Sequence, residues 1–215
     1  MKIIDEVINK VDVKLMDMFD QTIEAHTNAI EALVQSDNKK AVKCIEQDQE
    51  INQLEEEIIY DCMIVIAKHQ PVAKDLRKVI STIRIANDLE RVADYAKTIS
   101  KTAIVNSNET FLTDIFLKNS LKMSNIIVEM LKEEKKAILS NDADLAHNII
   151  TNEVNLSKYM SETFESNPFS SIKKENVESY MSLMGVLRTL ERSRGHIANI
   201  SESVIFTSTG RFVEL

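Results

Sequence analysis

Residues 85–103 read IANDLERVADYAKTISKTA, and residues 186–204 read VLRTLERSRGHIANISESV. In both stretches the apolar residues recur at steps of three and four, which places them on one face of an α-helix. The second stretch repeats the first at an offset of 101 residues, so that Arg91 aligns with Arg192. The repeated positions are Ile85, Leu89, Val92, Ala96, Ile99 and Ala103 in the first copy and Val186, Leu190, Ser193, Ile197, Ile200 and Val204 in the second, where Ser193 is polar. A repeat of this length is too long for a solenoid unit and predicts two related helical bundles.

The composition supports a helical protein. The 215 residues include only 3 Gly and 2 Pro, against a usual content of about 7% and 5%. Turn-rich β-sandwiches, barrels and glycine-cradled nucleotide folds are therefore disfavoured. The apolar period predicts six helices: one over residues 3–35, a second ending at 69, a third over 71–105, a fourth over 111–139, a fifth ending at 166 and a sixth over 172–208.

Short polar segments separate these helices. Ser36-Asp37-Asn38 and Ser140-Asn141-Asp142 interrupt the pattern and offer residues that cap the next helix, and Gly210 suits the end of the last one. We therefore predict an all-α protein of two tandem three-helix bundles related by pseudo-twofold symmetry. The predicted domains are residues 1–107 and 108–215.

Charge and cysteine content limit the functional classes. A net charge of −8 disfavours nucleic acid as the main partner, because phosphate neutralisation needs a basic face. No apolar run approaches the roughly 18 residues that span a bilayer, and Asp5, Glu6 and Asp12 stand where a signal peptide would be apolar. Cys44 and Cys62 lie on one predicted helix, about 27 Å apart, so they cannot form a disulfide with each other. These features predict a cytoplasmic protein with reduced thiols.

Three oxygen-bearing side chains share one face of the third predicted helix. Glu90 and Asp94 project about 40° apart, and Asn87 lies about 60° from Glu90. The spacing places them on an outer face, away from the apolar stripe. Such oxygens suit cations such as Mg, Ca, Mn or Fe. On spacing alone, however, this arrangement is typical of a solvated pair neutralised by Lys97 and Lys101, and two carboxylates do not complete a coordination sphere.

Arginines form a second feature of the same helix. Arg77, Arg84 and Arg91 recur every seven residues and lie within about 40° of one another. One interpretation is ion pairing with the acidic second helix. The other is a docking strip for an acidic partner or a layer of lipid headgroups.

Several segments together resemble the PhoU family over essentially the whole chain. Residues 70–77 (QPVAKDLR) are similar to the family's QPVAxDLR, and residues 88–94 (DLERVAD) are similar to the motif around its ERIGD. Residues 48–55 (DQEINQLE) resemble its second-helix motif, and residues 198–204 (ANISESV) with Thr209-Gly210 resemble its C-terminal end. The resemblance implies two tandem three-helix bundles, in agreement with the internal repeat.

The family carries an E(D)xxxD motif in each bundle, and members with this motif bind metal clusters there. Glu90 and Asp94 match the first motif, so the resemblance implies a divalent metal or iron cluster at this face. The second motif departs from the pattern, because Gly195 stands where Asp is expected and Arg194 replaces a small residue. Glu191 is thus a doubtful ligand, and we expect a weakened or absent second site. His196 points about 140° from Glu191 and would serve as a substitute ligand only if the helix were distorted.

The function implied by the resemblance is that of a non-enzymatic regulator. Such a protein would connect the ATPase subunit of the phosphate ABC transporter with a sensor histidine kinase and repress the phosphate-starvation response when phosphate is plentiful. The resemblance also implies a homodimer that reaches the membrane only through the transporter. Two alternatives stay open: a helical carboxylate-bridged metalloenzyme, and an accessory protein of a different phosphate carrier.

Overall fold

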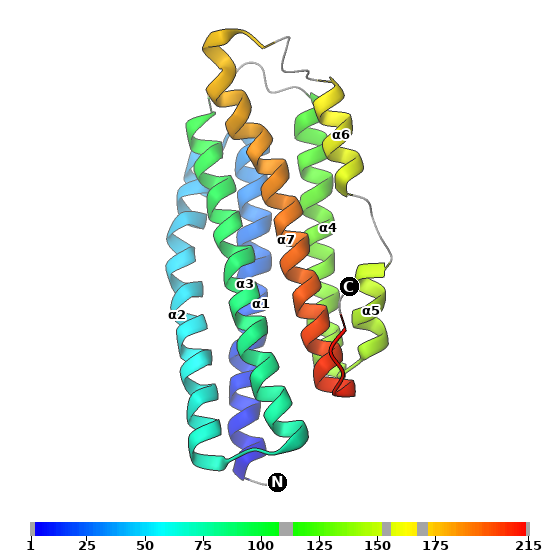
Figure 1. The fold of residues 1–215 in the computed structure, drawn as a ribbon. Coiled ribbons are helices and arrows are strands. Elements are labelled where there is room, and N and C mark those ends of the chain that lie inside the picture. Colours follow the sequence, from blue (N-terminus) through cyan, green and yellow to red (C-terminus); the bar gives the residue numbers. More distant parts are fainter. Residues whose placement is uncertain (1–2, 108–113, 152–155, 167–171, 214–215) are drawn as a thin grey trace.

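The helices follow the predicted order and run along the long dimension of the molecule (Figure 1). The structure is a computed structural model that describes residues 3–107, 114–151, 156–166 and 172–213. Within these ranges it contains no strand. The elements are α1 (Ile3–Gln35), α2 (Asn38–His69), α3 (Ala73–Val105), α4 (Asp114–Ser140), α5 (Ala143–Thr151), α6 (Leu156–Ser166), the 3-10 turn η2 (Lys174–Asn176) and α7 (Val177–Thr209).

The helices form two halves, which confirms the predicted fold. Helices α1, α2 and α3 pack against one another, and α4 packs against α5, α6 and α7. The halves meet where α3 contacts α7 and α1 contacts α4. In Figure 1, α5 and α6 follow each other along the same side of the molecule, in the place expected for the fifth helix. We retain the division at 107/108 as a proposal.

Local chemistry explains the helix ends. The Asp37 carboxylate accepts hydrogen bonds from the backbone N–H groups of Lys39 and Lys40 at 3.0 and 3.1 Å, which caps α2 as expected. Asp142 caps α5 by accepting from the Leu145 N–H at 2.9 Å. Gly210 ends α7 with a φ of 74°, a left-handed conformation that glycine adopts without a steric penalty.

Two helix starts differ from the prediction. Helix α3 begins at Ala73 rather than Pro71, because Gln70 ends α2 in a left-handed conformation and Val72 is extended. Helix α7 begins at Val177 rather than 172, after the 3-10 turn. The Asn167-Pro168 turn, the start of the fourth helix at residues 111–113 and the residues between α5 and α6 lie outside the described ranges.

The repeated apolar stripes form the centre of the core. All six predicted positions of α3 and all six of α7, Ser193 included, are buried. The apolar face predicted for α1 is buried from Ile8 to Ala32, and Phe19 is fully enclosed between the helices. Cys44 and Cys62 are both buried free thiols, and burial raises the pKa of Cys62 to about 12.

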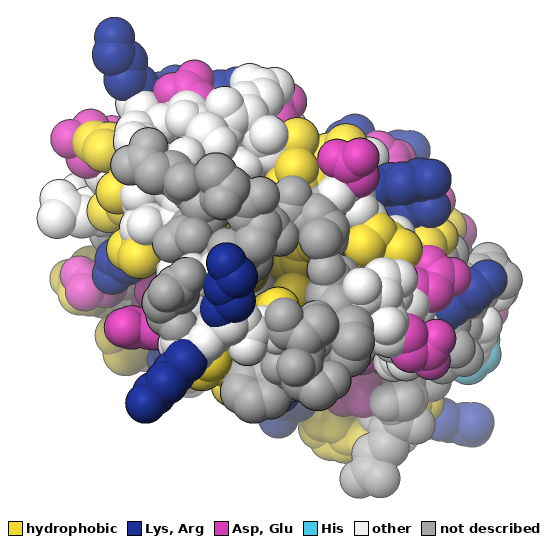
Figure 2. Space-filling model, turned by 90° about the horizontal axis from the view of Figure 1, so that it is seen from above, with side chains coloured by type: hydrophobic (Ala, Val, Ile, Leu, Met, Phe, Trp, Pro, Cys, Tyr) yellow, Lys and Arg dark blue, Asp and Glu magenta, His cyan; other side chains and the backbone are white. Residues whose placement is uncertain are grey.

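The outer surface carries charges of both signs. Figure 2, which views the molecule from above, shows acidic and basic side chains interspersed over its described surface. Across the part of the chain that the structure describes, no helix combines the length and the apolar character needed to cross a membrane.

Candidate functional site

The carboxylates of α3 lie beside α2 and are less solvated than expected. The Glu90 side chain is only 16% exposed, whereas that of Asp94 is 39% exposed. Burial is the largest cause that raises the pKa of Glu90, and the nearby charges of Asp94 and Asp48 raise it further, while Arg91 opposes them. Burial, followed by the charge of Glu90, also raises the pKa of Glu55 on α2. The expected outer face therefore carries an acidic cluster where α3 packs against α2, formed by Asp48, Glu55, Glu90 and Asp94.

A lysine supplies a positive charge to this acidic cluster. The Lys97 ammonium lies 2.6 Å from Asp48 Oδ2 and 3.5 Å from Asp94 Oδ1. The hydrogen bond to Asp48 is the main cause that raises the pKa of Lys97 and keeps it charged. Asp48 is 3% exposed, and its Oδ1 has no hydrogen-bond partner. The sequence anticipated neutralisation by Lys97 but not the buried Asp48 as its partner.

The residues present do not form a ready-made metal site. Among the residues that the structure describes, no group of three or more His, Cys, Asp or Glu side chains is arranged to hold a metal ion. The Asn87 side chain is exposed. Its amide nitrogen donates to the backbone oxygen of Ile83 on the same helix at 2.7 Å. The ammonium of Lys97 lies between Asp48 and Asp94, where a cation would be expected. Metal binding at Glu90 and Asp94 stays a prediction, and it requires that Lys97 move.

The second half lacks the matching acid pair. Gly195 has open space where a side chain would project, with no heavy atom within 4 Å of an ideal Cβ position. Glu191 is half-buried, and its Oε2 has no hydrogen-bond partner. His196 does not turn towards Glu191: its Nδ1 lies 2.8 Å from Asp88 Oδ1 on α3. Within the described ranges, none of the other expected metal ligands forms a hydrogen bond with Glu191 Oε2.

His196 instead belongs to a polar cluster at the junction of the halves. Its Nε2 lies 3.3 Å from the Tyr95 hydroxyl, and Asn199 donates to Asp88 Oδ1 at 3.1 Å. Tyr95 and His196 are equivalent positions under the 101-residue offset. Equivalent residues touch only near a twofold axis, so this contact marks the pseudo-twofold axis between α3 and α7. The repeat contained this signal, but only the packing shows that the two residues meet.

The arginines of α3 face different surroundings from those expected. Arg91 pairs with Glu90 on the same helix, with 3.3 Å between Nε and Oε2. The Arg84 guanidinium carbon lies 5.4 Å from the centre of the Phe212 ring, and Arg77 lies against Gly210. Within the described ranges no direct ion pair joins Arg77, Arg84 or Arg91 to the acidic α2. The charge of Arg91 still acts on that helix, because it lowers the pKa of Glu55 against the effect of burial. The chain after α7 folds back over the first two arginines.

The sequence did not indicate two buried titratable groups that contact α7. His26 on α1 is completely buried beside Ser193, with 3.3 Å between Nε2 and Oγ, and burial lowers its pKa to about 4. Glu134 on α4 is hydrogen-bonded to Ser201, and burial raises its pKa to about 8. The polar Ser193 within an apolar stripe was a visible signal for the first contact. No comparable signal marked Glu134.

The comparisons with known proteins agree with this architecture. A family model described as the PhoU domain matches residues 15–103 and 121–204. The phosphate-specific transport system accessory protein PhoU homolog of Clostridium acetobutylicum is 29% identical over 216 residues, covering 100% of this chain and 98% of the relative. The homolog from Pseudomonas putida is 30% identical, covering 87% of this chain and 74% of the relative. The crystal structure of the phosphate transport system regulatory protein PhoU from Streptococcus pneumoniae superposes with a TM-score of 0.86 at 26% identity, covering 99% of this chain and 100% of that one.

Proposed function

This chain belongs to the PhoU family, and from that premise we propose that it is an accessory protein that regulates phosphate transport. The observation that carries the proposal is the match of the family model to both halves, at residues 15–103 and 121–204. The relatives that span the chain are named as accessory proteins of the phosphate-specific transport system. This name favours that system over a different phosphate carrier.

The finer proposal is a non-enzymatic adaptor in the cytoplasm. We propose that it connects the ATPase subunit of the phosphate ABC transporter with a sensor histidine kinase and represses the starvation response when phosphate is plentiful. We further propose that it acts as a homodimer and reaches the membrane only through the transporter.

The outer faces of the first half support docking. Helix α2 packs against α1 and α3, and Tyr60, Met63 and Ile66 on α2 remain 61%, 51% and 37% exposed. Tyr60 lies beside Glu56, Glu57 and Asp61 of the same helix, which gives a mixed apolar and acidic surface of the kind that protein partners cover. On α3, Arg84 and Arg91 are exposed, and we retain them with Arg77 as a proposed docking strip.

The docking proposal is tested by affinity capture. Tagged protein from phosphate-replete cells, captured after mild crosslinking, should recover the transporter ATPase or the kinase, as read by mass spectrometry. The double variant Arg84→Gln, Arg91→Gln should reduce recovery, because it removes two exposed charges from one face. Arg188→Gln, an exposed arginine on α7, is the matched control and should leave recovery unchanged. Absence of both partners from the wild-type capture would contradict the adaptor role.

The metal proposal has its own test, because Lys97 would compete with a metal cation for the carboxylates of Asp48 and Asp94. Lys97→Met should increase bound Mn²⁺ or Fe²⁺ in equilibrium dialysis, since it leaves Asp48 and Asp94 without their counter-charge. Glu90→Gln combined with Asp94→Asn should abolish the increase. If Lys97→Met and wild type bound equally little metal, these carboxylates would serve in charge pairing alone. A carboxylate-bridged metalloenzyme would need still more ligands around the same acidic cluster.

A further inference from the structure

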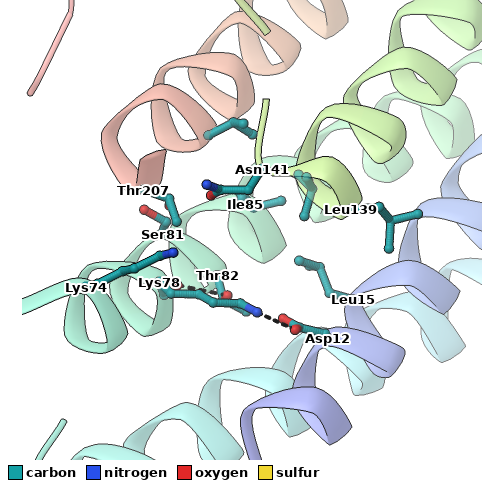
Figure 3. Close-up of a pocket in the computed structure, with 12 residues that line it drawn as sticks. Asp12, Leu15, Lys74, Lys78, Ser81, Thr82, Ile85, Leu139, Asn141 and Thr207 are labelled. Atoms are coloured by element: carbon teal, nitrogen blue, oxygen red, sulfur yellow. Dashed lines mark hydrogen bonds and ion pairs between the residues drawn. The ribbon is translucent and has the colours of Figure 1, made fainter. Parts of the chain in front are cut away.

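A cavity of about 180 Å³ lies between the two halves, at the N-terminal end of α3 (Figure 3). Its walls come from α1 and α3 of the first half and from α4, the α4–α5 turn and α7 of the second. None of its lining residues belongs to the acidic cluster. The cavity therefore needs an explanation that is independent of the proposed function.

One side of the cavity is polar and carries an excess positive charge. In Figure 3 the Lys74 amine, the Ser81 hydroxyl and the Asn141 amide lie on the same side. Lys78 is already paired with Asp12, whereas Lys74, which is an exposed residue, has no ion-pair partner among the described residues.

A buried hydroxyl on this side lacks a partner. Ser81 is 1% exposed, and its Oγ makes no hydrogen bond. Leaving such a group unsatisfied is unfavourable, because it loses its bonds to water on folding without replacement. A ligand oxygen in the cavity would satisfy it.

The opposite side of the cavity is apolar. Leu15 and Leu139 lie across the cavity from Lys74 in Figure 3, and Ile85, Ile138 and Val204 are further apolar residues of its lining. The volume corresponds to about six water molecules, or a ligand of about six non-hydrogen atoms. A fully hydrated inorganic ion would leave the apolar wall in contact with water.

We propose that this cavity binds a small organic anion, with its charged group beside Lys74, Ser81 and Asn141 and its short apolar body against Ile85 and Leu139. Arg and Lys recognise such anions through charge-assisted hydrogen bonds, of which the Lys74 ammonium would supply one. Because both halves line the cavity, the bound anion stabilises their junction. Binding to the folded state alone then raises the melting temperature by mass action.

Butyrate is a suitable probe, because it combines a carboxylate with a short apolar chain and has the required size. Titration followed by amide NMR should shift the signals of residues 74, 81 and 141 together. Acetate, which lacks the apolar body, and 1-butanol, which lacks the charge, should each bind more weakly. Lys74→Met should weaken butyrate binding by about tenfold or more, without changing the affinity for 1-butanol. Lys101→Met, an exposed lysine further along α3, should bind like wild type.

Three results would overturn the proposal. These are the absence of shifts in the cavity at millimolar butyrate, equal butyrate affinity in Lys74→Met and wild type, and tighter binding of inorganic phosphate than of butyrate. None of these results depends on whether the chain captures a transporter or a kinase, so the two proposals fail separately.

Discussion

At the scale of single residues, the most informative groups are two buried side chains with opposite titration behaviour. His26 stays neutral because its surroundings are apolar, and Glu134 stays protonated for the same reason. Both lie against α7, where Ser193 and Ser201 are their hydrogen-bond partners. Each therefore makes the free energy of unfolding depend on pH, but with opposite sign.

His26 should destabilise the protein in acid. Its folded-state pKa of about 4 lies below the ordinary histidine value of 6.5, so between these values the unfolded state binds a proton that the folded state does not. The free energy of unfolding should therefore fall by up to about 3 kcal/mol as the pH drops through this window. Urea titrations at several pH values measure the slope. His26→Asn should flatten it, and the exposed His147→Asn should not; an unchanged slope in His26→Asn would show that other groups cause it.

The ionisation of Glu134 should destabilise the protein as the pH rises from about 4.5 to about 8. Its folded-state pKa of about 8 lies above the ordinary value of 4.5, so its contribution to stability is fully present below pH 4.5 and is lost as the pH rises to 8. The expected loss is up to about 5 kcal/mol. Glu134→Gln keeps a neutral hydrogen-bonding side chain and should remove this loss in the same urea titrations. The exposed Glu165→Gln on α6 is the control, and equal pH profiles for both variants would contradict the assignment.

At the scale of helices, Gly195 inside α7 and Gly210 directly after its end serve different purposes. Gly195 has helical geometry and open space around its Cβ position, whereas Gly210 has a φ of 74° and lies 3.3 Å from the Arg77 guanidinium carbon, measured from its ideal Cβ position. The first glycine adds backbone entropy to the unfolded state without a structural need. The second is required by the left-handed turn that ends the helix.

Alanine at these two positions should change stability in opposite directions. Gly195→Ala should raise the free energy of unfolding by about 0.5–1 kcal/mol, because alanine favours the helix. Gly210→Ala should lower it by about 1 kcal/mol or more, because an L-residue is strained at positive φ and its Cβ would press on Arg77. Chemical denaturation of the two variants beside wild type measures both. A stabilising Gly210→Ala would show that the turn is not populated in solution.

At the scale of the whole molecule, the two titrating groups act on the same folding equilibrium. Between pH 4.5 and 6.5 the effect of His26 opposes that of Glu134. Their joint contribution should therefore be nearly flat in this range and should decrease on both sides of it. The double variant His26→Asn, Glu134→Gln should lose both slopes, and its profile should equal the sum of the single changes, because neither group is among the causes that shift the pKa of the other. A double variant that kept either slope would exclude this account.

The junction of the halves also belongs to this scale. Tyr95 and His196 meet at the pseudo-twofold axis, and Asp88 binds both His196 and Asn199. The cavity between the halves lies near the N-terminal end of α3. The junction of the halves thus contains a polar cluster at the axis and a partly polar cavity beside its apolar packing.

The sequence by itself determined the helices, their two-fold repetition and their buried faces. Apolar residues at steps of three and four set the position of each stripe along its own helix, and polar segments with Asp37, Asp142 and Gly210 set several helix ends. These features depend on residues close together in the chain, so a local pattern is sufficient. Starts that depend on backbone conformation in a connection, such as Ala73 and Val177, were misplaced by two to five residues.

Only the tertiary structure decided how the polar residues are used. The angle of Glu90 on its helix was predictable, but its burial depends on α2 beside it, and the pairing of Lys97 with Asp48 joins residues 49 positions apart. The same holds for His196 with Asp88, for His26 with Ser193 and for the cavity around Lys74. Helical periodicity fixes a side chain's direction about its own axis, whereas burial, pKa and partners depend on which helix packs against that side.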